Sequence, residues 1–103
     1  MLRTDDFASW IDDLKDLRGK QRILRRLDRL AQGHPGDVKP VGGGVSELRL
    51  AFGPGYRVYY LQDGRTVILL LCGGDKSTQR SDIEKAYRLA EEWKTYKDQE
   101  EQT

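Results

Sequence analysis

Two arginines, Arg49 and Arg57, lie in segments where apolar and polar residues alternate, a pattern typical of β-strands. Because the side chains of a strand point alternately to its two faces, Glu47, Arg49 and Arg57 would share one face of a sheet. Two guanidinium groups brought close together repel each other unless an acid or an anion joins them. The pattern therefore predicts one of two arrangements: a solvated ion-pair cluster that includes Glu47, or a site that holds an anion.

The segments that carry Arg49 and Arg57 are SELRLAF and YRVYYL, and the Gly-Pro-Gly at 53–55 predicts a tight turn between them. If this turn joins directly paired strands, the numbers of facing residues sum to about 108. Arg49 would then face Tyr59, while Ala51 would face Arg57 and leave room above it. The opposite face would be apolar and would pack on helices through Leu48, Leu50, Phe52, Tyr56, Val58 and Tyr60.

A third basic residue, Lys76, follows the segment RTVILLLC, which is apolar at nearly every position. This composition predicts a central strand covered on both faces, entered through a hairpin at the Asp-Gly of 63–64. The glycines of GGDKSTQ and the hydroxyl of Ser77 or Thr78 predict a connection from this strand to a capped helix. A helix N-terminus can also hold phosphate, which gives Lys76 a second interpretation as part of an anion site.

Two helices are expected before the strands, because apolar residues recur at helical spacing in both N-terminal segments. Thr4 would cap the first helix, Gly19 would interrupt the pattern, and Gly33 would end the second helix. The short link predicts an antiparallel helical hairpin. Between Arg18 and Arg29 the chain carries six basic residues and one acid, so this helix face is either merely solvated or a contact surface for nucleic-acid backbone.

The remaining patterns complete an α+β fold, with a helical hairpin, a three- to four-stranded antiparallel sheet and a C-terminal helix. The segment DVKPV predicts a short strand that Pro40 confines to an edge of the sheet. Ser81 and Glu84 have the spacing of a capping box for the last helix, although Ser77 could start that helix one turn earlier.

The length of 103 residues suits one domain, which we place at 1–97, with a polar and frayed tail at 98–103. The single cysteine, Cys72, suits a reducing compartment, and the N-terminal segment lacks the apolar core of a signal peptide, so a cytoplasmic protein is expected. No stretch approaches the roughly 18 consecutive apolar residues of a membrane span. His34 has no second histidine or nearby cysteine to share a metal ion, so neither a metal nor another cofactor is expected.

Three segments in combination resemble the RelE/ParE superfamily of type II toxins: RILRRLDRLAQGHPGDVKPVGGGVSELRL, GPGYRVYY and LLLCGGDKSTQRSDI. The chain is most similar to the HigB-like branch, also described as the phage-derived Gp49-like or addiction-module killer family. The resemblance runs from about Thr4 to Trp93 and implies a helical hairpin on an antiparallel sheet. Relatives usually open with a short strand before the first helix. Only Met1 to Arg3 precede Thr4, so this strand is expected to be truncated or missing.

The resemblance implies a metal-independent endoribonuclease, because RelE-type members cut messenger RNA in the ribosomal A site by attack of a ribose 2′-hydroxyl on the adjacent phosphate. It assigns Arg57 as a stabiliser of the transition state and Lys76 as a charge stabiliser or proton donor. Arg49 carries over as a basic residue of the preceding strand. The C-terminal tyrosine or histidine of these relatives has no evident match in the region of Asp82. The residues expected to contact RNA are Tyr59, by stacking on a base, and Glu47, Lys39, Arg22 and Arg26.

The resemblance also implies partners: a cognate helix-turn-helix antitoxin, messenger RNA on the ribosome, and operator DNA only through the antitoxin, with no membrane. The basic groove would accept an acidic or apolar segment of that antitoxin. Two alternatives share the fold. One is a ParE-like inhibitor of gyrase, and the other is a degenerate binding module without catalysis.

Overall fold

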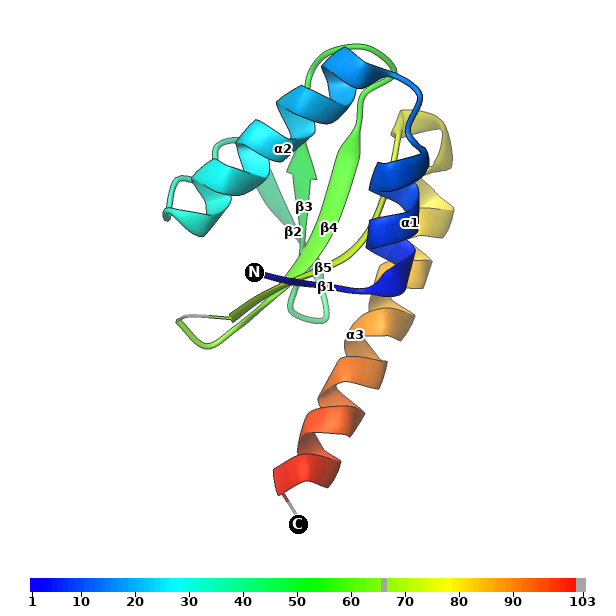
Figure 1. The fold of residues 1–103 in the computed structure, drawn as a ribbon. Helices are drawn as coiled ribbons and strands as arrows, with labels where there is room; N and C mark the ends of the chain where they lie inside the picture. Colours follow the sequence, from blue (N-terminus) through cyan, green and yellow to red (C-terminus); the bar gives the residue numbers. More distant parts are fainter. Residues whose placement is uncertain (66, 102–103) are drawn as a thin grey trace.

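The computed structural model describes residues 1–65 and 67–101 and shows helices on both faces of a central sheet (Figure 1). The elements follow one another as β1 (Leu2–Arg3), α1 (Asp5–Asp13), α2 (Leu17–Ala31), β2 (Val38–Gly42), β3 (Val45–Arg49), β4 (Arg57–Asp63), β5 (Val67–Gly74), the 3-10 turn η1 (Lys76–Thr78) and α3 (Gln79–Glu101). This order confirms the α+β class predicted from the sequence.

The sheet has the strand order β1-β5-β4-β3-β2 and is mixed rather than purely antiparallel. The extra strand is β1, which pairs in parallel with β5 through Leu2 and Leu69 and through Arg3 and Leu70. The strand expected to be truncated or missing is therefore present, with two residues. Two further predictions for the sheet are confirmed: β2 with Pro40 forms an edge, and β5 lies inside the sheet between β1 and β4.

Both N-terminal helices lie on one face of the sheet, where α1 lies against β5 and α2 crosses β3 and β4, so the two helices splay apart from their link (Figure 1). Thr4 caps α1 as predicted, and its hydroxyl accepts a hydrogen bond from the Phe7 amide at 3.1 Å. The helix ends at Asp13, and α2 begins at Leu17 with Asp16 as its N-cap.

Gly19 does not interrupt the helices but lies buried within the first turn of α2. A Cβ atom at this position would lie 2.5 Å from Oδ2 of Asp16 and 2.7 Å from the ring of Tyr56. The glycine is therefore explained by the close approach of the Tyr56 ring, which a sequence pattern alone does not reveal.

The sheet separates two apolar clusters. The first lies between the sheet and α1 and α2, and it contains the six residues expected on that face, with Phe52 partly buried. The second lies between the sheet and α3, where Val45, Leu69 and Leu71 pack with Ala86 and Ala90. The face that carries Glu47, Arg57 and Tyr59 is therefore covered by a helix along most of its length.

The predicted register between β3 and β4 is wrong by two residues. Arg49 lies directly opposite Arg57, and Glu47 lies opposite Tyr59. The reason is the loop: β3 ends at Arg49, and the turn hydrogen bond runs from the Gly55 amide to the Phe52 carbonyl at 3.0 Å. The turn thus begins one residue before the Gly-Pro-Gly, and residues 50–56 close as a loop. Both arginines still share one face of the sheet, as predicted.

The start of α3 also differs from the prediction. Asp75 caps the turn η1 and forms a capping box with Thr78, and α3 follows directly from Gln79. Ser81 lies inside the helix, where its hydroxyl donates to the Thr78 carbonyl at 3.0 Å, so it does not cap. The helix continues to Glu101; residues 102–103 of the predicted tail lie outside the described residues. Within residues 1–65 and 67–101 no helix is both long and apolar enough to cross a bilayer.

Candidate functional site

An open hollow of about 560 Å³ lies where β3 ends and β4 begins. We name it the basic hollow; it is lined by Asp37, Arg49, Arg57, Lys76 and the loop residues 50–55. The structure thus brings the three predicted catalytic residues together at one surface, although they come from two strands and the turn before α3. Such a surface can hold a phosphate group, because several cationic side chains line the same open space.

Lys76 reaches the basic hollow because the loop and the turn η1 pack against each other. The Lys76 amide donates to the Pro54 carbonyl at 3.3 Å. A Cβ atom on Gly55 would lie 3.2 Å from Cβ of Lys76, and the φ of Gly55 is +77°. A larger residue at 55 would therefore meet both backbone strain and the lysine. The exposed Lys76 side chain is left to face solvent at the rim.

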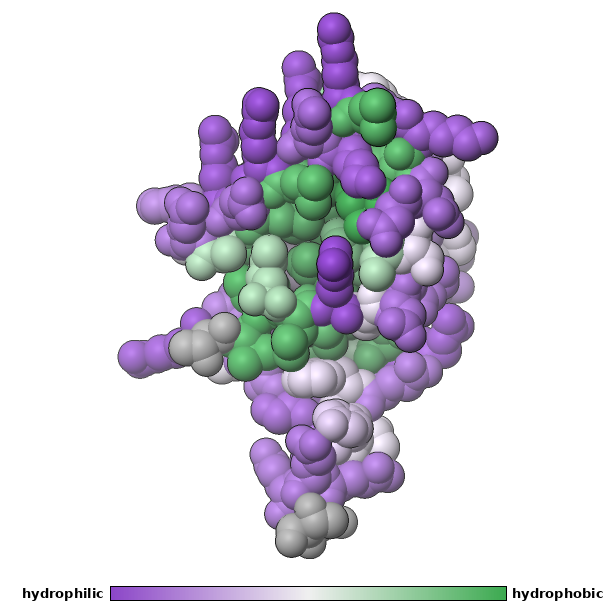
Figure 2. Space-filling view, in the orientation of Figure 1, coloured by the Kyte–Doolittle hydropathy of each residue, from purple (hydrophilic) through white to green (hydrophobic). Residues whose placement is uncertain are grey.

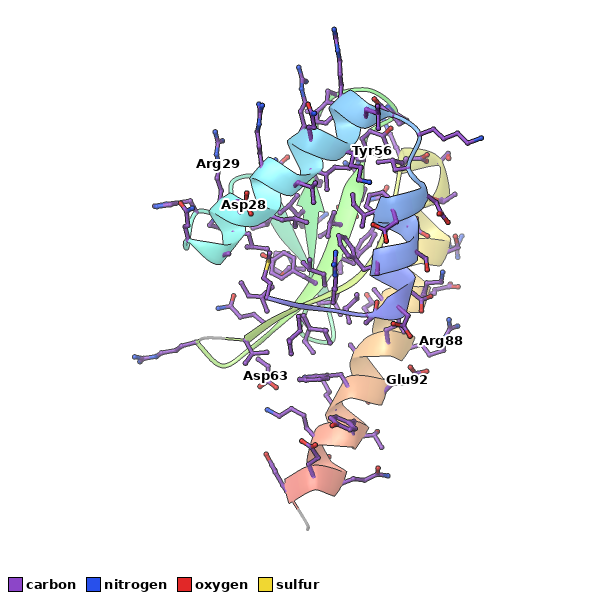
Figure 3. All side chains as sticks on the ribbon, in the orientation of Figure 1. Asp28, Arg29, Tyr56, Asp63, Arg88 and Glu92 are labelled. Atoms are coloured by element: carbon purple, nitrogen blue, oxygen red, sulfur yellow. The ribbon has the colours of Figure 1, made fainter. Side chains whose placement is uncertain are left out.

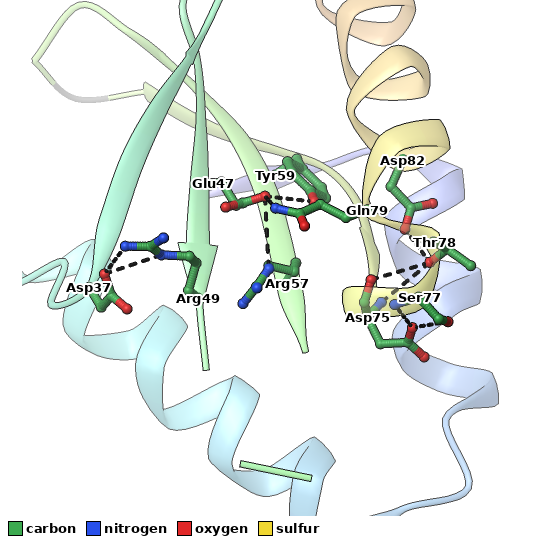
Figure 4. A network of polar contacts seen from close by, with 10 residues as sticks. All are labelled: Asp37, Glu47, Arg49, Arg57, Tyr59, Asp75, Ser77, Thr78, Gln79 and Asp82. Carbon is green, nitrogen blue, oxygen red and sulfur yellow. Dashed lines mark hydrogen bonds and ion pairs between the residues drawn. The ribbon is translucent and has the colours of Figure 1, made fainter. Parts of the chain in front are cut away.

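Arg57 is held at the inner wall of the basic hollow. Its side chain is 14% exposed, and its Nε lies 3.9 Å from Oε2 of Glu47. This Nε is buried and has no hydrogen-bond partner in the structure. Figure 4 shows that the outer end of the guanidinium is turned away from Glu47. The carboxylate therefore does not cap the arginine, and space remains for a ligand beside it.

Glu47 itself is buried beneath this wall, with only 1% of its side chain exposed. Its Oε2 accepts hydrogen bonds from the Tyr59 hydroxyl at 2.9 Å and from the Gln79 amide nitrogen at 2.8 Å. Burial raises the pKa of Tyr59 well above its usual value, and the hydrogen bond to Glu47 raises it further. Tyr59 therefore remains a neutral donor to the carboxylate at physiological pH.

Two predicted RNA contacts do not fit this geometry. Tyr59 is completely buried, so its ring cannot stack on a base, and Glu47 is equally inaccessible to a polymer. The prediction treated this face of the sheet as open, whereas α3 covers it and Gln79 at the start of α3 reaches Glu47. The alternation of residues along β3 and β4 identified which residues share this face. It did not indicate that α3 packs on the same face.

Arg49 is partly neutralised at the outer wall of the basic hollow. Its Nε and Nη2 both donate to Oδ1 of Asp37, at 3.3 and 2.9 Å. This hydrogen-bonded carboxylate raises the pKa of Arg49 above its usual value. Asp37 also offsets the repulsion between Arg49 and the facing Arg57. No pattern in the sequence pointed to Asp37 or Gln79, because their roles depend on the strand register and on where α3 begins.

A second hollow of about 270 Å³ adjoins the first and extends the basic surface onto α2. We name it the α2 hollow; its lining is Arg22, Arg25, Arg26 and Arg29 with Leu50, Ala51 and Phe52. The two hollows share these three loop residues. Figures 2 and 3 show long hydrophilic side chains projecting from α2, Arg29 among them. The predicted basic helix face is thus continuous with the basic hollow.

Arg22, Arg26 and Lys39 are the three remaining predicted RNA contacts, and they differ in how far their side chains are already bonded within the fold. Arg22 lies at the boundary of the two hollows, with its Cζ 4.6 Å from the ring centre of Phe52. Arg26 is occupied by the fold, because its Nη1 donates to the Arg49 carbonyl at 2.9 Å and its Nη2 to the Pro35 carbonyl at 3.0 Å. Lys39 is exposed on the edge strand β2 and lies opposite Glu47 in the pairing with β3.

The other sequence candidates lie away from both hollows. His34 is exposed in the loop after α2, and Cys72 is buried against α3. In the part of the chain that the structure describes, no group of three histidine, cysteine or carboxylate side chains is arranged to hold a metal ion. Independence of metals and cofactors stays a prediction.

Comparison with known proteins gives one family and one relative of unknown function. The family model described as "Phage derived protein Gp49-like" matches residues 9–94, a range that contains both hollows. A protein of Haemophilus influenzae described as "Uncharacterized protein" is 50% identical over 86 residues, which cover 84% of this chain and 87% of that protein. The matched range also contains Glu47, Tyr59 and Gln79.

Proposed function

The chain belongs to the phage-derived Gp49-like family, which is associated with addiction-module toxins, and from this premise we propose that it is the toxin of a type II toxin–antitoxin system. We further propose that it acts as a ribosome-dependent endoribonuclease on messenger RNA. The observation that carries the proposal is the convergence of Arg49, Arg57 and Lys76 on the open basic hollow.

The proposed reaction is an internal transfer of phosphate. The ribose 2′-oxygen attacks the adjacent phosphorus and gives its proton to solvent, and the bond from phosphorus to the 5′-oxygen breaks, which leaves a 2′,3′-cyclic phosphate and a 5′-hydroxyl. The transition state carries extra negative charge on phosphorus-bound oxygens, and cations fixed in advance around it lower the barrier. The outer nitrogens of Arg57 would contact the non-bridging oxygens, and Lys76 would stabilise the departing 5′-oxygen or donate a proton to it.

Arg49 has a lesser role in this scheme, because Asp37 already engages two of its nitrogens. It adds positive potential at the outer wall and helps to hold the phosphate. Much of the remaining rate enhancement would come from the ribosome, which aligns the 2′-hydroxyl with the phosphorus. Dependence on the ribosome is thus part of the proposal: the free protein would cut RNA slowly.

The α2 hollow would take the backbone of the RNA beyond the cut. Arg22, Arg25 and Arg29 are exposed and contact no specific base in such an arrangement, so binding there would be insensitive to sequence and sensitive to salt. Arg26 would contribute charge while it holds the loop, and the exposed Lys39 on β2 would extend the surface. A helix-turn-helix antitoxin would neutralise the toxin in the cytoplasm by covering one of these surfaces.

The test is primer extension on messenger RNA from purified ribosomes that were exposed to the protein. We expect cuts in A-site codons with the wild type, and a loss of roughly 100- to 1,000-fold for Arg57→Ala, as for removal of one oxyanion donor. Arg88→Ala, an exposed substitution on α3 away from the hollows, should cut at the wild-type rate. Intact RNA together with gyrase–DNA adducts in cells would overturn the proposal and favour a gyrase inhibitor.

A further inference from the structure

A buried carboxylate lies directly behind the arginine of the basic hollow. Three donors approach Oε2 of Glu47: the Tyr59 hydroxyl at 2.9 Å, the Gln79 amide at 2.8 Å and Nε of Arg57 at 3.9 Å. These groups come from β4 and from the first residue of α3. A buried carboxylate is costly unless it is hydrogen-bonded and paired with a cation, and the surroundings of Glu47 supply both.

We propose that Glu47 is a positioning residue that fixes the guanidinium of Arg57 toward the basic hollow, and that Tyr59 and Gln79 hold Glu47 in place for this purpose. The geometry of the guanidinium suits such a role. Its Nε faces the carboxylate, while its two outer nitrogens point the other way, toward the open space (Figure 4). A planar guanidinium can thus contact Glu47 on one side and a phosphate on the other at the same time.

The gap between Nε of Arg57 and Glu47 makes their contact an ion pair without a hydrogen bond. At 3.9 Å the contact is longer than a hydrogen bond, and Nε is buried without a partner. Tyr59 and Gln79 already occupy two acceptor positions of Oε2 of Glu47, so Glu47 acts on Nε of Arg57 mainly through its charge.

Gln79 connects Glu47 to the segment that carries Lys76, the second cation of the basic hollow. Lys76 opens the turn η1, and Gln79 begins α3 directly after that turn. Asp75 fixes the turn by accepting a hydrogen bond from the Ser77 amide at 2.8 Å. The bond from Gln79 to Glu47 therefore ties the segment of Lys76 to the strand behind Arg57. One buried carboxylate thereby sets the positions of cations from two separate parts of the chain.

The inference rests on the proposed function for its kinetic readout, so the test includes a second readout that needs no ribosome. The first variant is Glu47→Gln, which keeps the size of the side chain and removes its charge. Gln79→Ala is the second variant and tests the support of Glu47 from α3. Glu92→Gln, an exposed carboxylate of α3, is the matched control. The readouts are the Nε–H signal of Arg57 in nitrogen-15 NMR spectra and the rate of RNA cleavage on ribosomes.

We expect Glu47→Gln to shift the Arg57 Nε–H signal and to lower the cleavage rate by about 10- to 100-fold, as for loss of an outer-shell partner. Gln79→Ala should shift the same signal less, and Glu92→Gln should change neither readout. In the Arg57→Ala background Glu47→Gln should have no further effect on the rate, since the group that it positions is absent.

The outcomes separate this inference from the proposed function. An Arg57 signal that stays unchanged in both Glu47→Gln and Gln79→Ala would overturn the inference, whatever the cleavage rate. If the wild type makes no cuts on ribosomes but the signal shifts as expected, the proposed function fails and the positioning role stands. If Glu47→Gln does not fold, Gln79→Ala with its amide spectrum intact decides the question by the same signal.

Discussion

Arg49 and Arg57 lie directly opposite each other on β3 and β4, and each has its own carboxylate behind it. Asp37 holds Arg49 through a contact of 2.9 Å at the surface, whereas Glu47 stands 3.9 Å from Arg57 in the interior. The two arginines are therefore not equivalent. Arg49 is partly neutralised by Asp37, and Arg57 keeps its outer nitrogens for a ligand.

Asp37→Asn should strengthen the binding of RNA. The substitution removes the charge that offsets Arg49, so one more cation becomes available to phosphate. For a non-cleavable single-stranded oligonucleotide we expect a lower Kd and a salt dependence whose log–log slope is steeper by about 0.7. Fluorescence anisotropy over a salt series measures both. Asp12→Asn, an exposed acid of α1, is the control, and an equal slope in wild type and Asp37→Asn would contradict this role of Asp37.

Lys76→Ala should lower the rate of RNA cleavage on ribosomes by roughly 10- to 1,000-fold, since one cation near the transition state is lost. Lys76 is exposed at the rim of the basic hollow, so we expect it to act mainly by its charge. Lys76→Arg should then recover most of the rate. A dead Lys76→Arg variant with wild-type RNA affinity would instead identify Lys76 as the proton donor, because arginine does not give up its proton.

Gly73→Ala should destabilise the fold by about 1–3 kcal/mol, the usual cost of overpacking. A Cβ atom at Gly73 would lie 2.3 Å from the ring of Trp10, which joins α1 to β5. Urea unfolding followed by tryptophan fluorescence measures the change. Ser9→Ala, an exposed substitution on the same helix, should leave the midpoint within error. A stable Gly73→Ala variant would mean that α1 is free to move away from β5.

Cys72 should react slowly with thiol reagents in the native protein. Burial raises the pKa of its thiol to about 12, so the reactive thiolate is scarce at pH 8. A disulfide reagent that releases a coloured thiol should report little reaction in buffer and one equivalent per chain in urea. Rapid labelling of the native chain at pH 8 would show that α3 opens from the sheet on the time scale of the reaction.

Asp16 and Tyr56 should give the fold a stability that falls at both ends of the pH range. The Gly19 amide and the Tyr56 hydroxyl hold the pKa of Asp16 below its usual 3.8, so its contribution is complete above about pH 4 and is lost as the carboxyl is protonated. Burial and Asp16 raise the pKa of Tyr56 from 10.0 to about 12, so its contribution is complete below pH 10 and is lost between these values.

The measurement for this pair is the Tm of the wild type, Asp16→Ala and Tyr56→Phe across the pH range. At pH 7 Asp16→Ala should melt several degrees lower, because the α2 cap and the bond to Tyr56 are both lost. The difference from the wild type should shrink below pH 4. Tyr56→Phe should lose the alkaline limb and weaken the acid limb, because the Tyr56 hydroxyl also lowers the pKa of Asp16. A constant difference at all pH values would show that the carboxylate charge does not stabilise the fold.

The fold class followed from the sequence because the helices, β3 and β4 show clear periodicity and β5 is a continuous apolar run. The register between β3 and β4 did not follow from the sequence. The glycines of the loop at 50–56 allow turns that begin at different residues, and each turn gives a different register. The start of α3 was missed for a similar reason: Asp75, Ser77 and Ser81 all have side chains able to cap, and only packing selects among them.

The three cations of the candidate site were predictable, whereas Asp37 and the burial of Glu47 were not. Arg49, Arg57 and Lys76 stand out from their neighbours in strands and turns, so their type and position were informative. Tyr59 and Glu47 were read as surface residues, because nothing in the strand pattern shows that α3 returns to cover them. Long-range packing of this kind leaves no local signal in a single sequence.

The parallel pairing of β1 with β5 has a consequence for how the chain is made. The Thr4 amide donates to the Leu70 carbonyl, so β1 finds its partner only after the chain has been synthesised as far as β5. Lys76 and the support from Gln79 emerge later still. A nascent chain therefore lacks its assembled cluster of cations until the segment through Gln79 has left the exit tunnel, so the surface that we propose cuts RNA is not complete before then.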